Sequence, residues 1–170
     1  MIILLIFIHL NIFMKLLFIT FCFLFIQTNS LPPRFQGAYS YSYDNGKRHY
    51  APSGFLQVHY ISKDNILFYL EVQRSTDYNS GAMYGKLTLN RKSGKYEYLP
   101  KDTVDDCKLV FAWVKNKVII KTAAGECRFG YGVYADGTYK LEDGKNPPYC
   151  ETRTGRKIYF DKTPPDKYLE

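Results

Sequence analysis

Residues 106–141 read DCKLVFAWVKNKVIIKTAAGECRFGYGVYADGTYKL and carry the clearest structural pattern of the chain. From Cys107 to Trp113 every second residue is apolar or aromatic, which is the period of a β-strand with one buried face. After a turn at Lys115 and Asn116, the same inward face continues at Val118, Ile120 and Thr122. The stretch therefore predicts two antiparallel strands, followed by a glycine-rich segment that returns to the sheet.

Two cysteines flank this predicted hairpin. If the turn is centred near Asn116, residues at equal distances from it face each other, which places Cys107 opposite Gly125 and close to Cys127. The spacing favours a Cys107–Cys127 disulfide. A bridge from Cys150 to either of the other two is the alternative, because sequence alone does not fix which pair forms.

Alternating segments recur upstream of the hairpin, and residues typical of turns separate them. They cover residues 37–43, 54–61, 66–74, 83–89 and 95–99. None has the period of a helix. The pattern predicts an all-β protein, an antiparallel meander of seven or eight strands. We expect it to close into a small calycin- or lipocalin-like barrel, because an open sheet would leave two long apolar edges exposed.

The chain is expected to have three parts. Residues 1–30 contain one basic residue, no acidic residue and a long apolar run, which is typical of a signal peptide cleaved before Leu31. An uncleaved membrane anchor is the alternative, since the apolar region exceeds about 18 residues. Residues 31–141 would form the barrel domain. Residues 142–170 would form a C-terminal extension, in which residues 157–161 could add an edge strand.

Charge and cysteine content indicate the compartment and exclude some partners. Lysine and arginine outnumber aspartate and glutamate by 23 to 16, but the basic residues alternate along strands rather than cluster. We therefore expect a solvated exterior, no nucleic-acid partner and, after signal cleavage, no membrane partner. A disulfide and a signal peptide predict an exported protein, either periplasmic or secreted.

Residues that catalyse reactions or bind metals form no recognisable pattern. His49 and His59 lie in no nucleophile motif, and the cysteines and histidines lack the paired short spacing of a metal site. The acidic residues Asp102, Asp105 and Asp106 fall in a loop, where carboxylates ordinarily face water. The sequence predicts neither an enzyme nor a cofactor.

The chain contains 16 tyrosines, which suit both recognition surfaces and ordinary strands. Tyr39, Tyr41 and Tyr43 share one face of a strand, as either an exposed binding wall or rings that close the end of a barrel. Tyr69 and Tyr84 are expected to face outward. These five tyrosines are the candidate binding residues.

The motif C-x-L-x-F, followed by C-x-F-G-x-G-V-x-A-D-G-x-Y, runs here from Cys107 to Tyr139. It resembles a pattern in small exported bacterial proteins with no assigned function. The resemblance implies an exported bacterial β domain with a Cys107–Cys127 bridge, and it brings no catalytic residues. The glycines of the motif are interpreted as turn residues and Asp136-Gly137 as a hairpin turn, because a phosphate-binding loop would open a helix.

Two functions fit these observations. The first is a binding protein that recognises another protein, such as an inhibitor or immunity protein of a cell-wall-active enzyme, by analogy with other small exported β domains. The second is a carrier that holds a small apolar ligand inside the barrel. A filled core is the competing interpretation for the residues that would line such a cavity, Phe68, Leu70, Leu87, Phe111 and Trp113.

Overall fold

The computed structural model describes residues 35–42, 52–73, 79–100, 106–125, 127 and 129–165. These residues belong to a unit that spans Pro33–Glu170. The predicted signal peptide and Tyr43 lie outside the described residues, and within these no helix is long and apolar enough to span a membrane.

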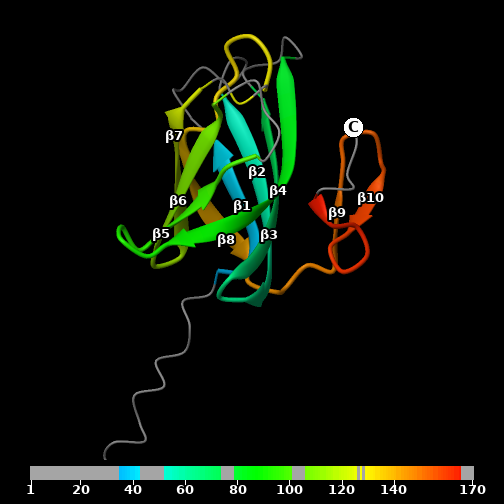
Figure 1. The fold of residues 1–170 in the computed structure, drawn as a ribbon. Helices are drawn as coiled ribbons and strands as arrows, with labels where there is room; N and C mark the ends of the chain where they lie inside the picture. The colour runs from blue at the N-terminus through cyan, green and yellow to red at the C-terminus, as the bar shows by residue number, and fades with distance from the viewer. Residues whose placement is uncertain are drawn as a thin grey trace, which may run out of the picture. The chain divides into compact units, whose positions relative to one another are not determined.

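Eight strands form a closed antiparallel barrel in sequence order, and β1 pairs with β8 to complete it (Figure 1). The all-β barrel meander predicted from the sequence is confirmed. Its strands are β1 Gly37–Ser42, β2 Ser53–Ser62, β3 Asn65–Gln73, β4 Ser80–Asn90, β5 Lys95–Tyr98, β6 Lys108–Val114, β7 Lys117–Ala124 and β8 Gly137–Asp143.

The predicted β6–β7 hairpin is present, but its turn is centred between Lys115 and Asn116 and not on Asn116. An irregularity between Lys108 and Leu109 then shifts the register by one residue, which restores the predicted offset near Cys107. Val114 pairs with Lys117 across a two-residue turn, in which Lys115 has a positive φ of 56°. At the far end, a Cβ placed on Gly125 would lie 2.7 Å from the backbone nitrogen of Cys107. The strand ends are therefore close, and Cys107 forms a disulfide with Cys127, with a Cα–Cα distance of 4.8 Å. This confirms the predicted bridge and leaves Cys150 as a buried free thiol.

The barrel interior is filled by large side chains from opposite walls. Phe68 on β3 packs against Phe111 on β6 with ring centroids 5.1 Å apart, and both are fully buried. A Cβ placed on Gly85 would lie 2.8 Å from the ring of Phe68 and closer still to that of Tyr98. Because a methyl group does not fit at this level, the middle of the barrel is a packed core.

The C-terminal extension forms a separate two-stranded hairpin, β9 Tyr149–Glu151 and β10 Lys157–Tyr159 (Figure 1). The expected strand near residue 157 is present, but it pairs with β9 and not with the barrel, which is closed and offers no edge. The hairpin packs on the outer face of β3 and β4. This second apolar cluster contains Leu67, Tyr69, Tyr84, Cys150, Ile158 and Phe160.

Polar contacts also fix the extension to the barrel. The Tyr84 hydroxyl donates to the Thr163 carbonyl at 2.6 Å. The His59 ring stacks on Phe160, with centroids 5.0 Å apart, and its Nδ1 lies 2.6 Å from the Pro147 carbonyl oxygen. Because a carbonyl only accepts hydrogen bonds, Nδ1 carries the proton.

Candidate functional site

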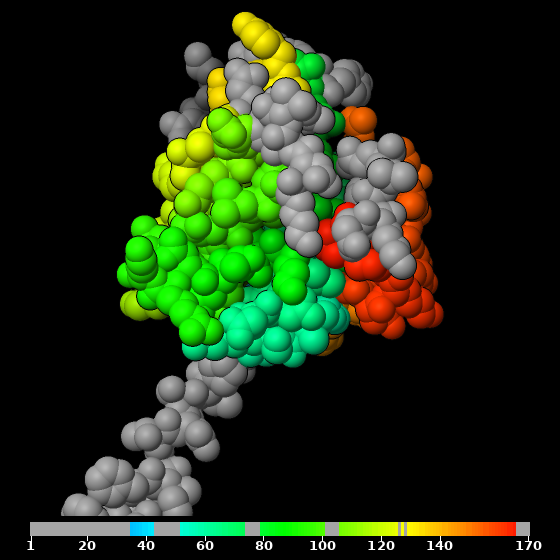
Figure 2. Space-filling model, viewed as in Figure 1, coloured from blue at the N-terminus to red at the C-terminus, as the bar shows by residue number. Residues whose placement is uncertain are grey.

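Among the described residues, the most exposed large hydrophobic side chains are two tyrosines in the connection between β7 and β8. We call residues 125–136 the tyrosine loop. Its residues Tyr131 and Tyr134 are 89% and 73% exposed. The segment stands at the top of the view in Figure 2, in yellow. Burying an aromatic ring stabilises a folded protein, so two rings that stay this exposed to water indicate a surface that contacts something else.

Besides the disulfide-bonded Cys127, three side chains of the same loop are buried and anchor it to the barrel core: Phe129, Val133 and Ala135. The loop therefore alternates between residues that enter the core and tyrosines that leave it. A turn makes this possible, because the Val133 amide donates to the Gly130 carbonyl at 3.2 Å across Tyr131 and Gly132. Gly132 has a φ of 69°, the left-handed conformation that glycine adopts without steric cost.

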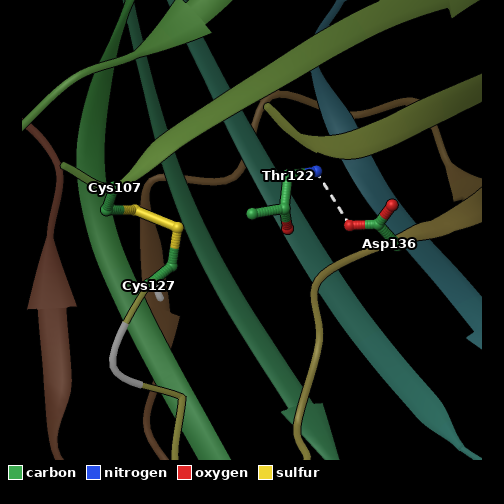
Figure 3. Close-up of a disulfide and its surroundings, with 4 residues drawn as sticks. All are labelled: Cys107, Thr122, Cys127 and Asp136. Atoms are coloured by element: carbon green, nitrogen blue, oxygen red, sulfur yellow. Dashed lines mark hydrogen bonds between the residues drawn. A yellow bond between two sulfur atoms is a disulfide. The ribbon is translucent and has the colours of Figure 1, made fainter. Parts of the chain in front are cut away.

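The C-terminal side of the loop is held by Asp136. One oxygen of its carboxylate accepts a hydrogen bond from the Thr122 amide at 2.8 Å, as Figure 3 shows, and the other lies 3.3 Å from Lys121 Nζ. The Tyr139 hydroxyl also donates to the Ala135 carbonyl at 3.0 Å. Asp136 thus supplies an acceptor to the β7 backbone before β8 begins. The interpretation of Asp136-Gly137 as a tight hairpin turn is wrong, because residues 125–136 separate the two strands.

The N-terminal side of the loop is held by covalent and steric contacts. The Cys107–Cys127 disulfide ties it to the start of β6 (Figure 3). Beyond the bridge, the backbone of Phe129 lies directly on Gly81 of β4, so a Cβ at Gly81 would be 2.7 Å from the Phe129 carbonyl carbon. The described residues of the tyrosine loop are therefore held on both sides of Tyr131 and Tyr134.

Of the five tyrosines predicted to bind a partner, the four that the structure describes do not share a surface. Tyr39 points into the barrel and is 1% exposed, and the half-buried Tyr41 packs on Tyr139 with ring centroids 5.5 Å apart. Tyr69, also 1% exposed, and Tyr84 face outward as expected but lie beneath the C-terminal hairpin. Tyr43 lies outside the described residues. A partner would reach the buried residues among them only if the covering segments moved.

Burial also changes the acidity of several of these groups. It raises the pKa of Tyr39, although a hydrogen bond from Trp113 opposes the effect. It raises the pKa of Tyr84, and the nearby Cys150 adds to that increase. Burial likewise raises the pKa of the Cys150 thiol to about 12, so this thiol is protonated at neutral pH.

Sequence reasoning missed Tyr131 and Tyr134. Their motif was interpreted as turns alone, because glycine spacing shows where a chain bends but not which side chains project from the bend. The available signal was that each tyrosine is followed by a small or branched apolar residue, Gly132-Val133 and Ala135, within a segment too short for a strand.

No metal site emerges from the described ranges, in which no three histidine, cysteine, aspartate or glutamate side chains cluster as ligands would. Comparisons with protein-family models, with curated proteins and with solved structures find no match to this chain. The resemblance to small exported bacterial proteins stays a prediction. The tyrosine loop is the clearest surface feature of the described residues.

Proposed function

We propose that this protein is a non-enzymatic, exported binding protein that recognises another protein through Tyr131 and Tyr134. One observation carries the proposal: two strongly exposed tyrosines stand on a loop whose remaining described contacts immobilise it. Tyrosine offers a large rigid contact area with a polar tip, which is why it is enriched where proteins recognise one another.

The immobilised loop favours tight binding for a physical reason. Association costs free energy wherever a flexible segment must be ordered at the interface. Here the loop is already ordered in the folded protein, by the disulfide, the Asp136 carboxylate and the buried Phe129. A partner would therefore gain the contact area of both rings with little further loss of backbone entropy.

The compartment and the core support the same function. A disulfide is consistent with an exported protein, and we place this one in the periplasm or outside the cell. A carrier that holds its ligand in the centre of the barrel is less well supported. The fully buried Phe68 and Phe111 occupy that space, and Gly85 has no room for even one added methyl group.

Site-specific photo-crosslinking in the producing cells tests the proposal. The photoreactive amino acid p-benzoylphenylalanine would replace Tyr131 in one strain, Tyr134 in a second and Tyr159 in a third. Tyr159 is the matched control, because it is a 42% exposed tyrosine on the separate β9–β10 hairpin. We expect one and the same adduct from positions 131 and 134, and none of that mass from position 159.

The captured protein would then be purified and its affinity measured. Truncation of a tyrosine at the centre of an interface costs about 2 kcal/mol or more, which is about a thirtyfold loss of affinity. We expect at least this loss for Tyr131→Ala or Tyr134→Ala, and unchanged affinity for Tyr159→Ala. Equal affinity for all three variants would show that the tyrosine loop does not carry recognition.

A further inference from the structure

The barrel end opposite the tyrosine loop contains a second aromatic arrangement. The tyrosine loop leads into the start of β8, whereas Phe35 precedes the start of β1, which lies beside the end of β8. There the ring of Phe35 sits among Tyr60, Tyr96 and Trp113, which we call the aromatic socket. The ring centroids lie 6.2, 5.2 and 5.1 Å from that of Phe35, and the last two contacts are edge-to-face.

Two consecutive hydrogen bonds lie beside these rings. The Trp113 indole donates to the Tyr39 hydroxyl at 3.3 Å, and that hydroxyl donates to the Phe35 carbonyl at 3.2 Å. The socket therefore contacts two parts of Phe35, its aromatic ring and its backbone carbonyl oxygen.

The walls of the socket are held independently of the occupant. Tyr60 is on β2, and both its backbone amide and its carbonyl bond the Asn146 side chain, at 2.9 and 3.0 Å. Tyr96 is on β5, and its hydroxyl donates to the Lys63 carbonyl at 3.2 Å. The Tyr96 and Trp113 rings also pack against each other at 5.5 Å. Removal of Phe35 would leave these contacts in place.

The occupant is held less firmly than the walls. Phe35 and Gln36 precede β1 and belong to no strand. Besides the bond from Tyr39, the polar contact described for them is that of the Gln36 side-chain amide with the Gly144 carbonyl, at 3.3 Å. The bonds that hold Tyr96 and Trp113 are equally long, at 3.2 and 3.3 Å, so residues 35 and 36 differ from the walls in lying outside the strands. Short segments of this kind open locally at low free-energy cost.

We propose that the aromatic socket is a binding site for small compounds that join one aromatic ring to a carbonyl group, and that Phe35 occupies it in their absence. A ligand would place its ring where the Phe35 ring lies and its carbonyl oxygen against the Tyr39 hydroxyl. Residues 35 and 36 would then leave the socket. This site is separate from the tyrosine loop, so either proposal can fail without the other.

The test uses N-acetyl-L-phenylalaninamide, which carries the ring and carbonyl of Phe35 itself, and the chain after removal of residues 1–30. Trp113 is the sole tryptophan, so its indole N–H gives a single assignable NMR signal. We expect the probe to shift this signal saturably and to show a nuclear Overhauser contact from its ring to the indole. N-acetyl-L-alaninamide should do neither.

Two variants distinguish binding of the probe in the aromatic socket from binding elsewhere on the protein. Phe35→Ala removes the competing occupant, so the probe should bind about 10- to 100-fold more tightly if the socket of the wild-type protein is open about 1–10% of the time. Phe55→Ala is the matched control, since Phe55 lies on the barrel strand β2 and is 39% exposed. It should bind like the wild-type protein.

The polar part of the proposal has its own variant. Tyr39→Phe should weaken binding of N-acetyl-L-phenylalaninamide and leave that of toluene, which has no carbonyl, unchanged. The absence of a saturable shift in the wild-type protein would overturn the proposal even if Phe35→Ala binds the probe. Phe35 would then be a permanent part of the core. Equal affinity of the wild-type and Phe35→Ala proteins would overturn it as well, because the probe would then bind elsewhere.

Discussion

Among single residues, Gly81 sets the position of the tyrosine loop. The backbone of Phe129 rests on it so closely that any side chain would displace the loop or the strand. Gly94 differs, since nothing lies within 4 Å of a Cβ placed there, and only its positive φ of 68° favours glycine. One glycine is thus required by packing and the other by conformation.

Gly81→Ala should therefore destabilise the fold by about 1–3 kcal/mol, the usual cost of forcing an extra methyl group into a packed site. The measurement is the urea midpoint of unfolding. Gly94→Asn is the control, because asparagine tolerates a positive φ, and it should cost well under 1 kcal/mol. If the two variants unfold at the same urea concentration, the close contact does not constrain the loop.

Cys150 gives a pH-dependent prediction. Burial raises the pKa of its thiol from 9.0 to about 12 in the folded chain. Above pH 9 the unfolded chain loses this proton while the folded chain retains it, so stability must fall as pH rises from about 9 toward 12. The contribution is fully present below pH 9.

Cys150→Ala should remove that part of the decline. Unfolding midpoints measured at several pH values should fall less steeply above pH 9 in the variant than in the wild-type protein. Both proteins keep some decline, because burial also raises the pKa of Tyr139 and Tyr39. Parallel curves for the two proteins would show that the thiol is not titrating in this way.

At the scale of elements, the β9–β10 hairpin covers an apolar part of the barrel wall. Phe160 is its largest buried side chain and stacks on His59. Phe160→Ala should weaken docking of the hairpin, because truncating a buried phenylalanine costs about 3–5 kcal/mol. The barrel itself should stay folded, since its core lies on the other face of β3 and β4.

The reactivity of Cys150 toward Ellman's reagent under native conditions would report this undocking. We expect a large increase in its rate in Phe160→Ala, with the Trp113 emission unchanged. Tyr159→Ala is the control, because Tyr159 neighbours Phe160 but is 42% exposed. The Cys150 thiol of this variant should stay protected from the reagent. A thiol equally protected in all three proteins would show that Phe160 does not hold the hairpin.

The features of the fold that could be predicted from the sequence are those in which the contacting residues lie close together along the chain. Alternation predicted the barrel strands because each strand's inward face follows from its own residues. It also placed Tyr69 outward correctly. It could not show that Tyr69 is buried, because Ile158 and Phe160 cover it from about 90 positions further along the chain. The strand near residue 157 was predicted for the same local reason, but its partner, β9, was not.

Within the candidate site, the local sequence pattern predicted the disulfide but not the exposed tyrosines. The disulfide was predictable because two strands of known register bring Cys107 and Cys127 together. The exposure of Tyr131 was not, because it depends on the burial of Phe129 against Gly81, a contact between β4 and a loop about 50 residues away.

For the whole molecule, the disulfide couples the stability of the barrel to the position of the tyrosine loop, because it joins the start of β6 to the N-terminal side of that loop. The bridged cysteines are 20 residues apart, a span for which loss of the bridge costs about 3 kcal/mol in the chain-entropy account. Wild-type protein treated with a reductant should lose about this much stability and bind its partner more weakly. The double variant Cys107→Ser/Cys127→Ser should match the reduced protein and not respond to reductant.

The matched control is Cys150→Ala, which keeps the bridge and should respond to reductant as the wild-type protein does. Denaturant unfolding with and without reductant measures the stability, and titration of the crosslinked partner measures the affinity. If reduction changes neither quantity, the bridge is dispensable both to the barrel and to the loop.

The buried position of Cys150 has a consequence for how the chain reaches its folded state. The three cysteines of the described residues can form three different bridges. β6 and β7 bring Cys107 and Cys127 together as a local hairpin, which forms in microseconds, whereas disulfides form in seconds or longer. Cys150 lies in the cluster between β9 and the outer barrel wall, whereas Cys107 and Cys127 belong to the core cluster, so a bridge from Cys150 would draw β9 away from its place on the barrel. Such a chain would leave Leu67, Tyr69 and Ile158 in contact with solvent, so docking of the C-terminal hairpin favours the molecules in which the native bridge has formed.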